Sequence, residues 1–191
     1  MVQYRRRLMA QKPLTWISKA WQHIGLTENT SKAKHNPKIL EWLSKMGSFN
    51  GEHKAWWKED ETPWCGTFVG AILGESKRYV IPSWYRAGDW ADSRYMTKLE
   101  KPAYGAIAIK KRKGGNHVFF IVGVNSKGQV MGLGGNQGNK VSIIPFNLSD
   151  IDSIYWPSMV SNGKPVKSIP SPDRYILPIV SATGTFGASE A

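Results

Sequence analysis

The sequence predicts an α+β domain whose helices come first along the chain and whose strands follow. Before residue 80, apolar residues recur at helical spacing. After residue 104, short apolar segments rich in β-branched and aromatic residues alternate with turn residues. These segments cover residues 104–110, 117–124, 129–134, 140–146 and 152–157. The connections between them are too short for crossover helices, so we expect an antiparallel sheet of about five strands.

Two amphipathic helices are expected first, each with an apolar stripe that packs on the main body. The first helix covers residues 13–25, and its stripe is Leu14, Ile17, Trp21 and Ile24. The second helix begins at Pro37 and ends at Gly47, and its stripe is Ile39, Leu40, Leu43 and Met46. Residues 79–100 show few periodic signals, and we expect a long loop with one short helical piece.

A third helix begins around the only cysteine of the chain. Thr62 suits an N-cap and Pro63 suits the first helical position. Cys65 shares an apolar face with Phe68 and Ile72 and lies in the first turn, where the helix dipole favours the nucleophilic thiolate. The competing interpretation is a small, inert core residue, because free cysteines are often buried.

A nucleophilic cysteine needs a base, and His117 is the best placed of the four histidines. It opens the strand 117–124 directly after a Gly-rich turn, which places it at the mouth of a cleft. His23 and His35 are expected on the surface near the first helices, and His53 lies in a polar loop. The competing interpretation of His117 is a solvated residue at a strand end.

The hairpin after His117 predicts the group that orients its ring. A two-residue loop at residues 126–127 places Asn136 opposite His117, within hydrogen-bonding reach. A three-residue loop would shift the register by one residue and make Gln137 a candidate. We therefore predict that Cys65 attacks a carbonyl carbon, that His117 is the general acid–base, and that Asn136 orients it. The backbone N–H of Cys65 is the expected oxyanion donor.

Several other residues near Cys65 have both a functional and a structural interpretation. Trp64, Trp84 and Gln137 are the predicted substrate-binding residues, with core packing as the alternative for the two indoles. Asp60 and Glu61 are expected to be solvated or helix-capping acids.

Charge and composition limit the partners. The chain has 191 residues and a formal net charge of +12, which predicts attraction to a polyanion such as nucleic acid, lipopolysaccharide or an anionic cell-wall polymer. Much of the excess lies in a basic arm around Arg5 to Arg7 and in the run from Lys110 to Lys113. One cysteine excludes an intrachain disulfide, and without a Cys/His cluster we expect no metal and no cofactor. With neither a secretion signal nor a membrane-spanning run, the protein is expected to be made in the cytoplasm.

At these motifs the chain resembles the papain-like peptidoglycan hydrolases, namely the cysteine, histidine-dependent amidohydrolases/peptidases (CHAP) and the NlpC-type endopeptidases. The resemblance rests on PWCGTFVGAIL, NHVFFIVGV and LGGNQGNKVSIIPF, with HNPKILEWLSKMG and SWYRAGDW similar to a phage and prophage branch. It covers about residues 13–158. One departure is that many CHAP sequences carry a Glu shortly before the Asn, where this chain has glycines.

The resemblance implies a papain-like core and cleavage of an amide in the peptide part of the cell wall, with an endopeptidase favoured over an N-acetylmuramoyl-L-alanine amidase. It also implies a phage lysin, free or carried in the virion with other virion proteins. The expected organisation is a basic arm over residues 1–12, a catalytic domain over 13–158 and a Pro/Ser/Gly-rich tail over 159–191, with a disordered end.

Two other functions stay open from the sequence. The first is a non-catalytic basic protein of the virion or a nucleic-acid-binding protein, although no recognisable nucleic-acid motif is present. The second is an acyltransferase on the same scaffold, which would form new amide bonds instead of releasing amines.

Overall fold

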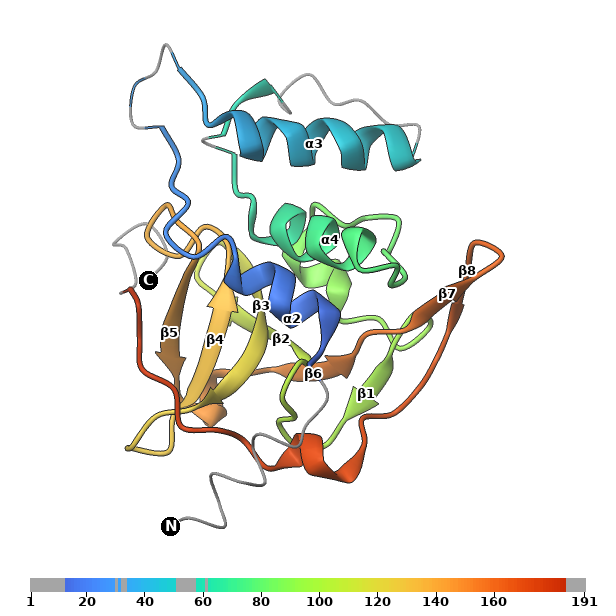
Figure 1. The fold of residues 1–191 in the computed structure, drawn as a ribbon, viewed down its shortest axis with the longest axis vertical. Helices are drawn as coiled ribbons and strands as arrows, with labels where there is room; N and C mark the ends of the chain where they lie inside the picture. The colour runs from blue at the N-terminus through green and yellow to red at the C-terminus, as the bar shows by residue number, and fades with distance from the viewer. Residues whose placement is uncertain (1–12, 30, 32–33, 51–57, 61, 185–191) are drawn as a thin grey trace.

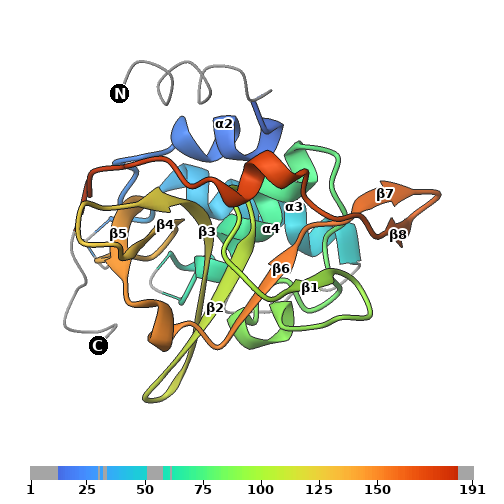
Figure 2. The same cartoon turned by 90° about the horizontal axis from the view of Figure 1, so that it is seen from below.

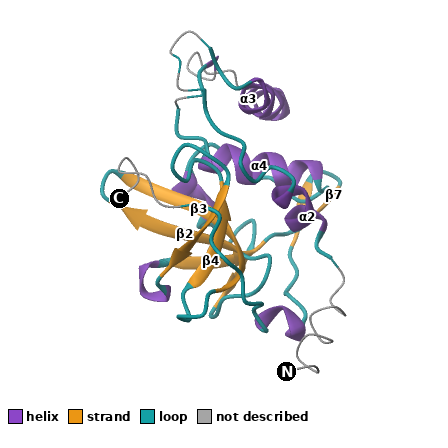
Figure 3. Cartoon of the chain, turned by 60° about the vertical axis from the view of Figure 1, so that its left-hand side comes forward, coloured by secondary structure: helices purple, strands orange, loops and turns teal. Residues whose placement is uncertain are grey.

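The computed structural model describes residues 13–29, 31, 34–50, 58–60 and 62–184 (Figure 1). Within these ranges the chain forms three α-helices and a six-stranded sheet in the order β1-β6-β2-β3-β4-β5, with every neighbouring pair antiparallel. The predicted α+β class and antiparallel sheet are therefore confirmed. Figure 3 shows the α-helices gathered to one side of the strands, whereas short 3₁₀-helices lie elsewhere around the sheet.

The first two helices are α2 (Thr15–Trp21) and α3 (Pro37–Asn50). The predicted end of α3 at Gly47 is wrong, because the helix continues through this buried glycine. The helical penalty of one glycine is only about 1 kcal/mol, and packing outweighs it. The buried stripe of α3 is Ile39, Trp42, Leu43 and Met46, so Trp42 takes the place predicted for the half-buried Leu40.

The cysteine helix is α4 (Cys65–Glu75), which starts two residues later than predicted. Its N-cap residue is Trp64, with no side-chain cap, so Thr62 is not the cap. Every residue from Cys65 to Leu73 is buried, because α4 packs against α2, α3 and the sheet. Figure 1 shows α4 below α3 and above the strands. A helix covered all round needs no polar face, which explains its almost continuous apolar sequence.

All five predicted strands are present, and the structure adds one more. They are β2 (Ile107–Arg112), β3 (Gly115–Val124), β4 (Val130–Gly134), β5 (Ser142–Phe146) and β6 (Ser153–Trp156). The additional strand, β1 (Thr97–Leu99), lies in the predicted loop, which also contains the expected short helical piece, η2 (Ala87–Trp90). After η3 (Leu148–Asp150), β6 returns to pair with both β1 and β2.

The β3–β4 hairpin has a three-residue loop, so the predicted two-residue loop is wrong. Asn125 N donates to Gln129 O at 2.9 Å, and Gly128 adopts a φ of 79°, which favours glycine. A bulge between Ile121 and Gly123 absorbs the extra residue and restores the predicted pairing of Ile121 with Gly132. The loop therefore leaves the register near His117 unchanged.

The described part of the predicted tail is structured. It contains the hairpin of β7 (Met159–Ser161) and β8 (Lys164–Val166), which projects from the body in Figure 2, and η4 (Pro172–Tyr175). Residues 178–183 then bond to Val124 and Ile143 of the sheet. The basic arm and residues 185–191 lie outside the described residues. In the described ranges, no helix combines the length and apolar character needed to cross a membrane.

Candidate active site

Cys65 is the first residue of α4, at the end of the helix where backbone N–H groups have no carbonyl partner one turn earlier. Its side chain is 2% exposed and belongs to the core that also contains Trp64 and Phe68. The position therefore combines a water-poor environment with the positive end of an eleven-residue helix. The helix end favours a thiolate nucleophile, whereas the apolar burial opposes it.

His117 lies near the start of β3 and is 1% exposed. Its ring stacks with Phe119 and Phe146, with centroids 5.6 and 6.1 Å away. Its Nε2 atom lies 3.0 Å from Oε1 of Gln137. The stack and the hydrogen bond together hold the imidazole in one orientation.

The Gln137 side chain determines which nitrogen of His117 carries the proton. Its Nε2 donates to the backbone oxygen of Ser142 at 2.6 Å and that of Gly132 at 3.3 Å, and carbonyl oxygens only accept. Oε1 must therefore face His117, and it accepts a hydrogen bond from Nε2–H. In the neutral ring this leaves Nδ1, which is also buried, as the basic nitrogen.

The hydrogen bond predicted for Asn136 is thus made by Gln137, and the prediction for Asn136 is corrected on this point. β4 ends at Gly134, and the chain turns sharply because Asn136, Gly138 and Asn139 all have a φ near +60°. The turn brings the Gln137 side chain back over the end of the strand. Gln137 is fully buried, so it does not line an open substrate site as predicted.

Two glycines join the Cys65 helix to the His117–Gln137 pair. A Cβ atom on Gly135 would lie 2.5 Å from Trp64 and 2.6 Å from Phe68, so the backbone there packs directly on the start of α4. A Cβ atom on the preceding Gly134 would lie 2.7 Å from Oε1 of Gln137. One dipeptide therefore touches both halves of the candidate site, and neither position has room for a side chain.

The loop before β1 closes the site from another side. A Cβ atom on Gly66 would lie 2.5 Å from the backbone oxygen of Trp84, and one on Gly88 would lie 2.6 Å from Nδ2 of Asn116. Gly66 follows Cys65 and Asn116 precedes His117. This loop thus bridges the residues next to the predicted nucleophile and base.

Burial governs the protonation of His117. It lowers the pKa of His117 to about 4, and the positive charges of Arg112 and Lys110 act in the same direction, whereas the Gln137 hydrogen bond opposes them. Lys110 pairs directly with His117 across β2 and β3. The imidazole is therefore neutral at pH 7, as a general base must be.

The two predicted aromatic walls are in the core. Trp64 and Trp84 are both fully buried, so neither presents a face to a ligand in this structure. The indole N–H of Trp64 donates to Oε1 of Glu28 at 2.6 Å, and the backbone oxygen of Trp84 accepts from the Trp90 indole at 2.9 Å. Their core-packing alternative is the one observed.

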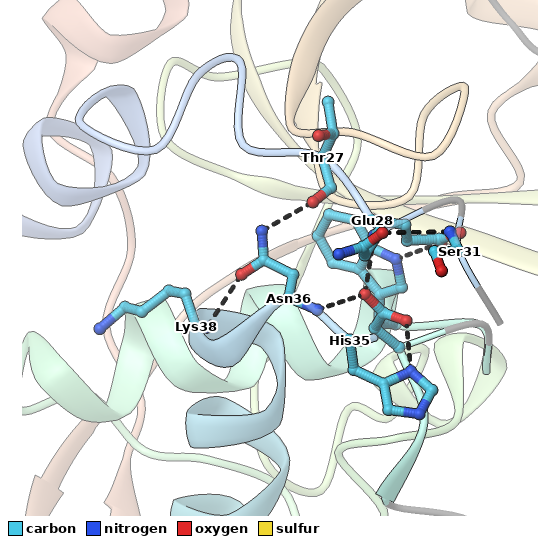
Figure 4. A network of polar contacts seen from close by, with 9 residues as sticks. Thr27, Glu28, Ser31, His35, Asn36 and Lys38 are labelled. Carbon is cyan, nitrogen blue, oxygen red and sulfur yellow. Dashed lines mark hydrogen bonds and ion pairs between the residues drawn. The ribbon is translucent and has the colours of Figure 1, made fainter. Parts of the chain in front are cut away.

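Asp60 is fully buried, so the prediction that it is solvated or caps a helix is wrong. Figure 4 shows the polar network around its partners His35 and Asn36. Its carboxylate accepts from the backbone N–H groups of Asn29 at 2.9 Å and Asn36 at 2.6 Å, and it pairs with Nδ1 of His35 at 2.9 Å. Burial alone would raise the pKa of Asp60, but these hydrogen bonds together hold it below its usual range. Glu61 lies outside the described residues.

The basic run from Lys110 to Lys113 lies at the tip of the β2–β3 hairpin, which extends from the body in Figure 2.

Among the described residues, no three or more His, Cys, Asp or Glu side chains gather in a way that could hold a metal ion. A scan against protein-family models, a search of curated proteins and a search of solved structures found no match to this chain.

Proposed function

We propose that this protein is a papain-like peptidoglycan hydrolase that cleaves an amide bond in the cell-wall peptide with Cys65, His117 and Gln137. The observation that carries the proposal is the buried hydrogen bond between Nε2 of His117 and Oε1 of Gln137 at 3.0 Å, next to the glycines that pack on the start of α4. This bond leaves Nδ1 as the basic nitrogen. A base with a fixed tautomer, linked through Gly134 and Gly135 to the start of the cysteine helix, is compatible with a thiol hydrolase.

In the proposed reaction, Nδ1 of His117 accepts the thiol proton while Sγ of Cys65 attacks the carbonyl carbon. The developing oxyanion is stabilised by the backbone N–H of Cys65 at the helix terminus. His117 then returns the proton to the leaving amine as the C–N bond breaks, and a thioester remains. Water, deprotonated by the same imidazole, hydrolyses the thioester and regenerates Cys65.

Gln137 also offers an explanation for the departure from the CHAP pattern. The resembled sequences carry a Glu close to the position of Gly134. In this chain the amide of Gln137 occupies that space, because a Cβ atom on Gly134 would lie 2.7 Å from Oε1 of Gln137. We infer that the orienting oxygen reaches His117 from a residue three positions further along the chain. The phage or prophage origin stays part of the proposal through the motif resemblance.

The direct test is clearing of purified murein in a gel under reducing conditions, by the wild-type protein and by Cys65→Ala. We expect clearing by the first and none by the second. Absence of clearing by the wild-type protein would overturn the proposal and favour a basic binding protein. Circular dichroism of both proteins establishes that the variant is folded.

A further inference from the structure

A polar pocket of 340 Å³ lies along the loop that bridges the residues next to Cys65 and His117. Its volume falls within the range of about 300–1,000 Å³ that is typical of ligand sites. Ser83 and Gly88 are among its lining residues. Ser83 precedes Trp84, whose backbone oxygen packs on Gly66, and Gly88 itself packs on Asn116. The pocket therefore adjoins both of the loop contacts that reach the proposed catalytic centre.

The walls of the pocket are held by contacts within the protein. Ala91 N donates to Gly88 O at 3.1 Å, which fixes the turn between them. The ring of Tyr95 stacks on Tyr79 with centroids 5.7 Å apart, and Tyr95 O accepts from Oγ of Ser158 at 2.7 Å. A pocket with walls fixed in this way loses little conformational entropy when it binds a ligand.

The charges around the pocket are balanced, which favours a neutral ligand. Nε and Nη2 of Arg94 donate to Oδ2 of Asp92 at 2.9 and 2.6 Å. The Arg94 guanidinium holds the pKa of Asp92 below its ordinary value, and the charge of Lys167 acts in the same direction. Asp89 is the second acidic residue of the lining, so two negative charges face two positive ones. An ionic ligand of either sign would therefore meet a like charge.

Two polar side chains of the pocket remain for a ligand. In the part of the chain that the structure describes, the carboxylate of Asp89 and the hydroxyl of Ser83 take part in no hydrogen bond or ion pair. The exposed residues Pro82 and Ala91 add apolar surface beside them. A carboxylate and a hydroxyl next to apolar atoms match a pyranose ring, which carries hydroxyl groups on its rim and C–H groups on its faces.

We propose that this pocket is a glycan subsite that binds a pyranose ring of the murein polysaccharide through Asp89 and Ser83. The inference rests on the proposed function, because it takes its ligand from that substrate. The peptides of murein are attached to this polysaccharide, so a sugar bound in the pocket holds its peptide close to the proposed catalytic centre. Asp89 is then a specificity-determining residue that favours peptides still attached to the glycan.

The test measures binding of chitotetraose, a neutral tetramer of N-acetylglucosamine, to the full-length protein by calorimetry. This probe contains no peptide, so no hydrolysis of a peptide amide accompanies binding. We expect binding by the wild-type protein and about tenfold weaker binding by Asp89→Asn, as for a lost hydrogen bond to a charged group. Ala91→Leu, which places a larger side chain in the pocket, should weaken binding at least as much.

Asp150→Asn is the matched control, because Asp150 is an exposed aspartate of the 3₁₀-helix η3 and does not line the pocket. Its binding should equal that of the wild-type protein, and circular dichroism establishes that all three variants are folded. No binding by the wild-type protein would overturn the subsite. Unchanged binding in both Asp89→Asn and Ala91→Leu, or an equal loss in Asp150→Asn, would overturn it as well.

This result is separable from the murein-clearing test. Clearing without binding that depends on Asp89 would remove the subsite and leave the proposed hydrolase intact. Sugar binding that depends on Asp89, without clearing by the wild-type protein, would retain the sugar site and remove the hydrolase.

Discussion

His117 and the two polar residues near the end of β4 allow a graded substitution series. We expect His117→Ala to lower kcat/KM on soluble muropeptides by at least about 100-fold, the usual contribution of general acid–base catalysis. Gln137→Ala should cost about tenfold or more because the ring loses the bond that fixes its tautomer. Asn136→Ala should cost less, because Gln137 makes that bond. A larger loss for Asn136→Ala than for Gln137→Ala, or a crippling effect of His53→Ala, would contradict these assignments.

The lowered pKa of His117 makes the folded state sensitive to acid. Its ordinary pKa is 6.5 and its folded value is about 4, so between these pH values the unfolded chain binds a proton that the folded chain does not. The free energy of unfolding should therefore fall as the pH drops from 6.5 to 4, by up to about 1.4 kcal/mol per pH unit. It should not fall further from this cause below pH 4.

Urea unfolding of the wild-type protein and His117→Gln at several pH values isolates this contribution. A glutamine can still donate to Gln137, but it does not titrate. The difference between the two proteins should change between pH 6.5 and 4 and stay constant above pH 7. Parallel curves over the whole range would show that His117 keeps an ordinary pKa in the folded state.

At the residue level, the candidate nucleophile Cys65 and the candidate base His117 are proposed from local patterns, and the structure places them at a helix start and near a strand start. The sequence names Gln137 only as an alternative, because the choice between Gln137 and Asn136 depends on the left-handed backbone after Gly134. The burial of Asp60 has no local signal, since its partners Asn29 and Asn36 are more than 20 residues away in sequence.

Among the elements, the C-terminal segment supports the strand that holds Gln137. Thr183 N donates to Ile143 O, and Ile143 N donates to Oγ1 of Thr183, both at 2.9 Å. Ile143 follows Ser142, whose backbone oxygen accepts from Gln137. Thr183 therefore helps to position Gln137, the residue that orients the proposed base His117.

We expect Thr183→Val to weaken this support, because valine has the shape of threonine but no oxygen to accept the Ile143 N–H. The rate at which iodoacetamide alkylates Cys65 should change its pH dependence in Thr183→Val and regain the wild-type profile in Thr183→Ser. A wild-type profile in Thr183→Val would show that the tail does not affect the catalytic pair. Cys65 is the one cysteine of the chain, so labelling reports on it alone.

Element prediction succeeds where the pattern is long and fails where the signal is short. The five strands and the three α-helices follow from periodicity, but the stripe predicted for the first helix is wrong, because α2 buries Trp16, Ile17 and Ala20 and leaves Trp21 exposed. Strand β1 has only three residues, Thr97–Leu99, and forms because β6 pairs with it. The β3–β4 loop is one residue longer than predicted, and the unpredicted bulge shifts the register back by one residue. The predicted pairing of Ile121 with Gly132 is therefore correct although the predicted loop length is not.

At the scale of the whole molecule, the net charge of +12 predicts docking on an anionic wall or surface. Hydrolysis of whole walls should weaken steeply as salt rises above about 0.15 M, where the screening length is roughly 8 Å. Hydrolysis of a soluble muropeptide should change much less. Deleting residues 1–12, which include Arg5 to Arg7, should reduce action on walls and spare the soluble substrate.

The comparison requires both substrates across a salt series, with and without these twelve residues. Lys127→Gln, at an exposed lysine in the β3–β4 loop, is a control for the loss of one positive charge. Equal salt sensitivity on the two substrates would show that the charge serves catalysis or folding instead of docking.

The central claim, that Cys65 hydrolyses an amide of the murein peptide, is tested most directly by mass spectrometry of purified murein digested in ¹⁸O-labelled water. The account predicts soluble products with new free amines and new carboxyl groups that each carry one ¹⁸O, and none of them with Cys65→Ala. Products that form without ¹⁸O and contain new amide bonds would indicate an acyltransferase. The same labelled products from Cys65→Ala, or no products from the wild-type protein, would contradict the claim.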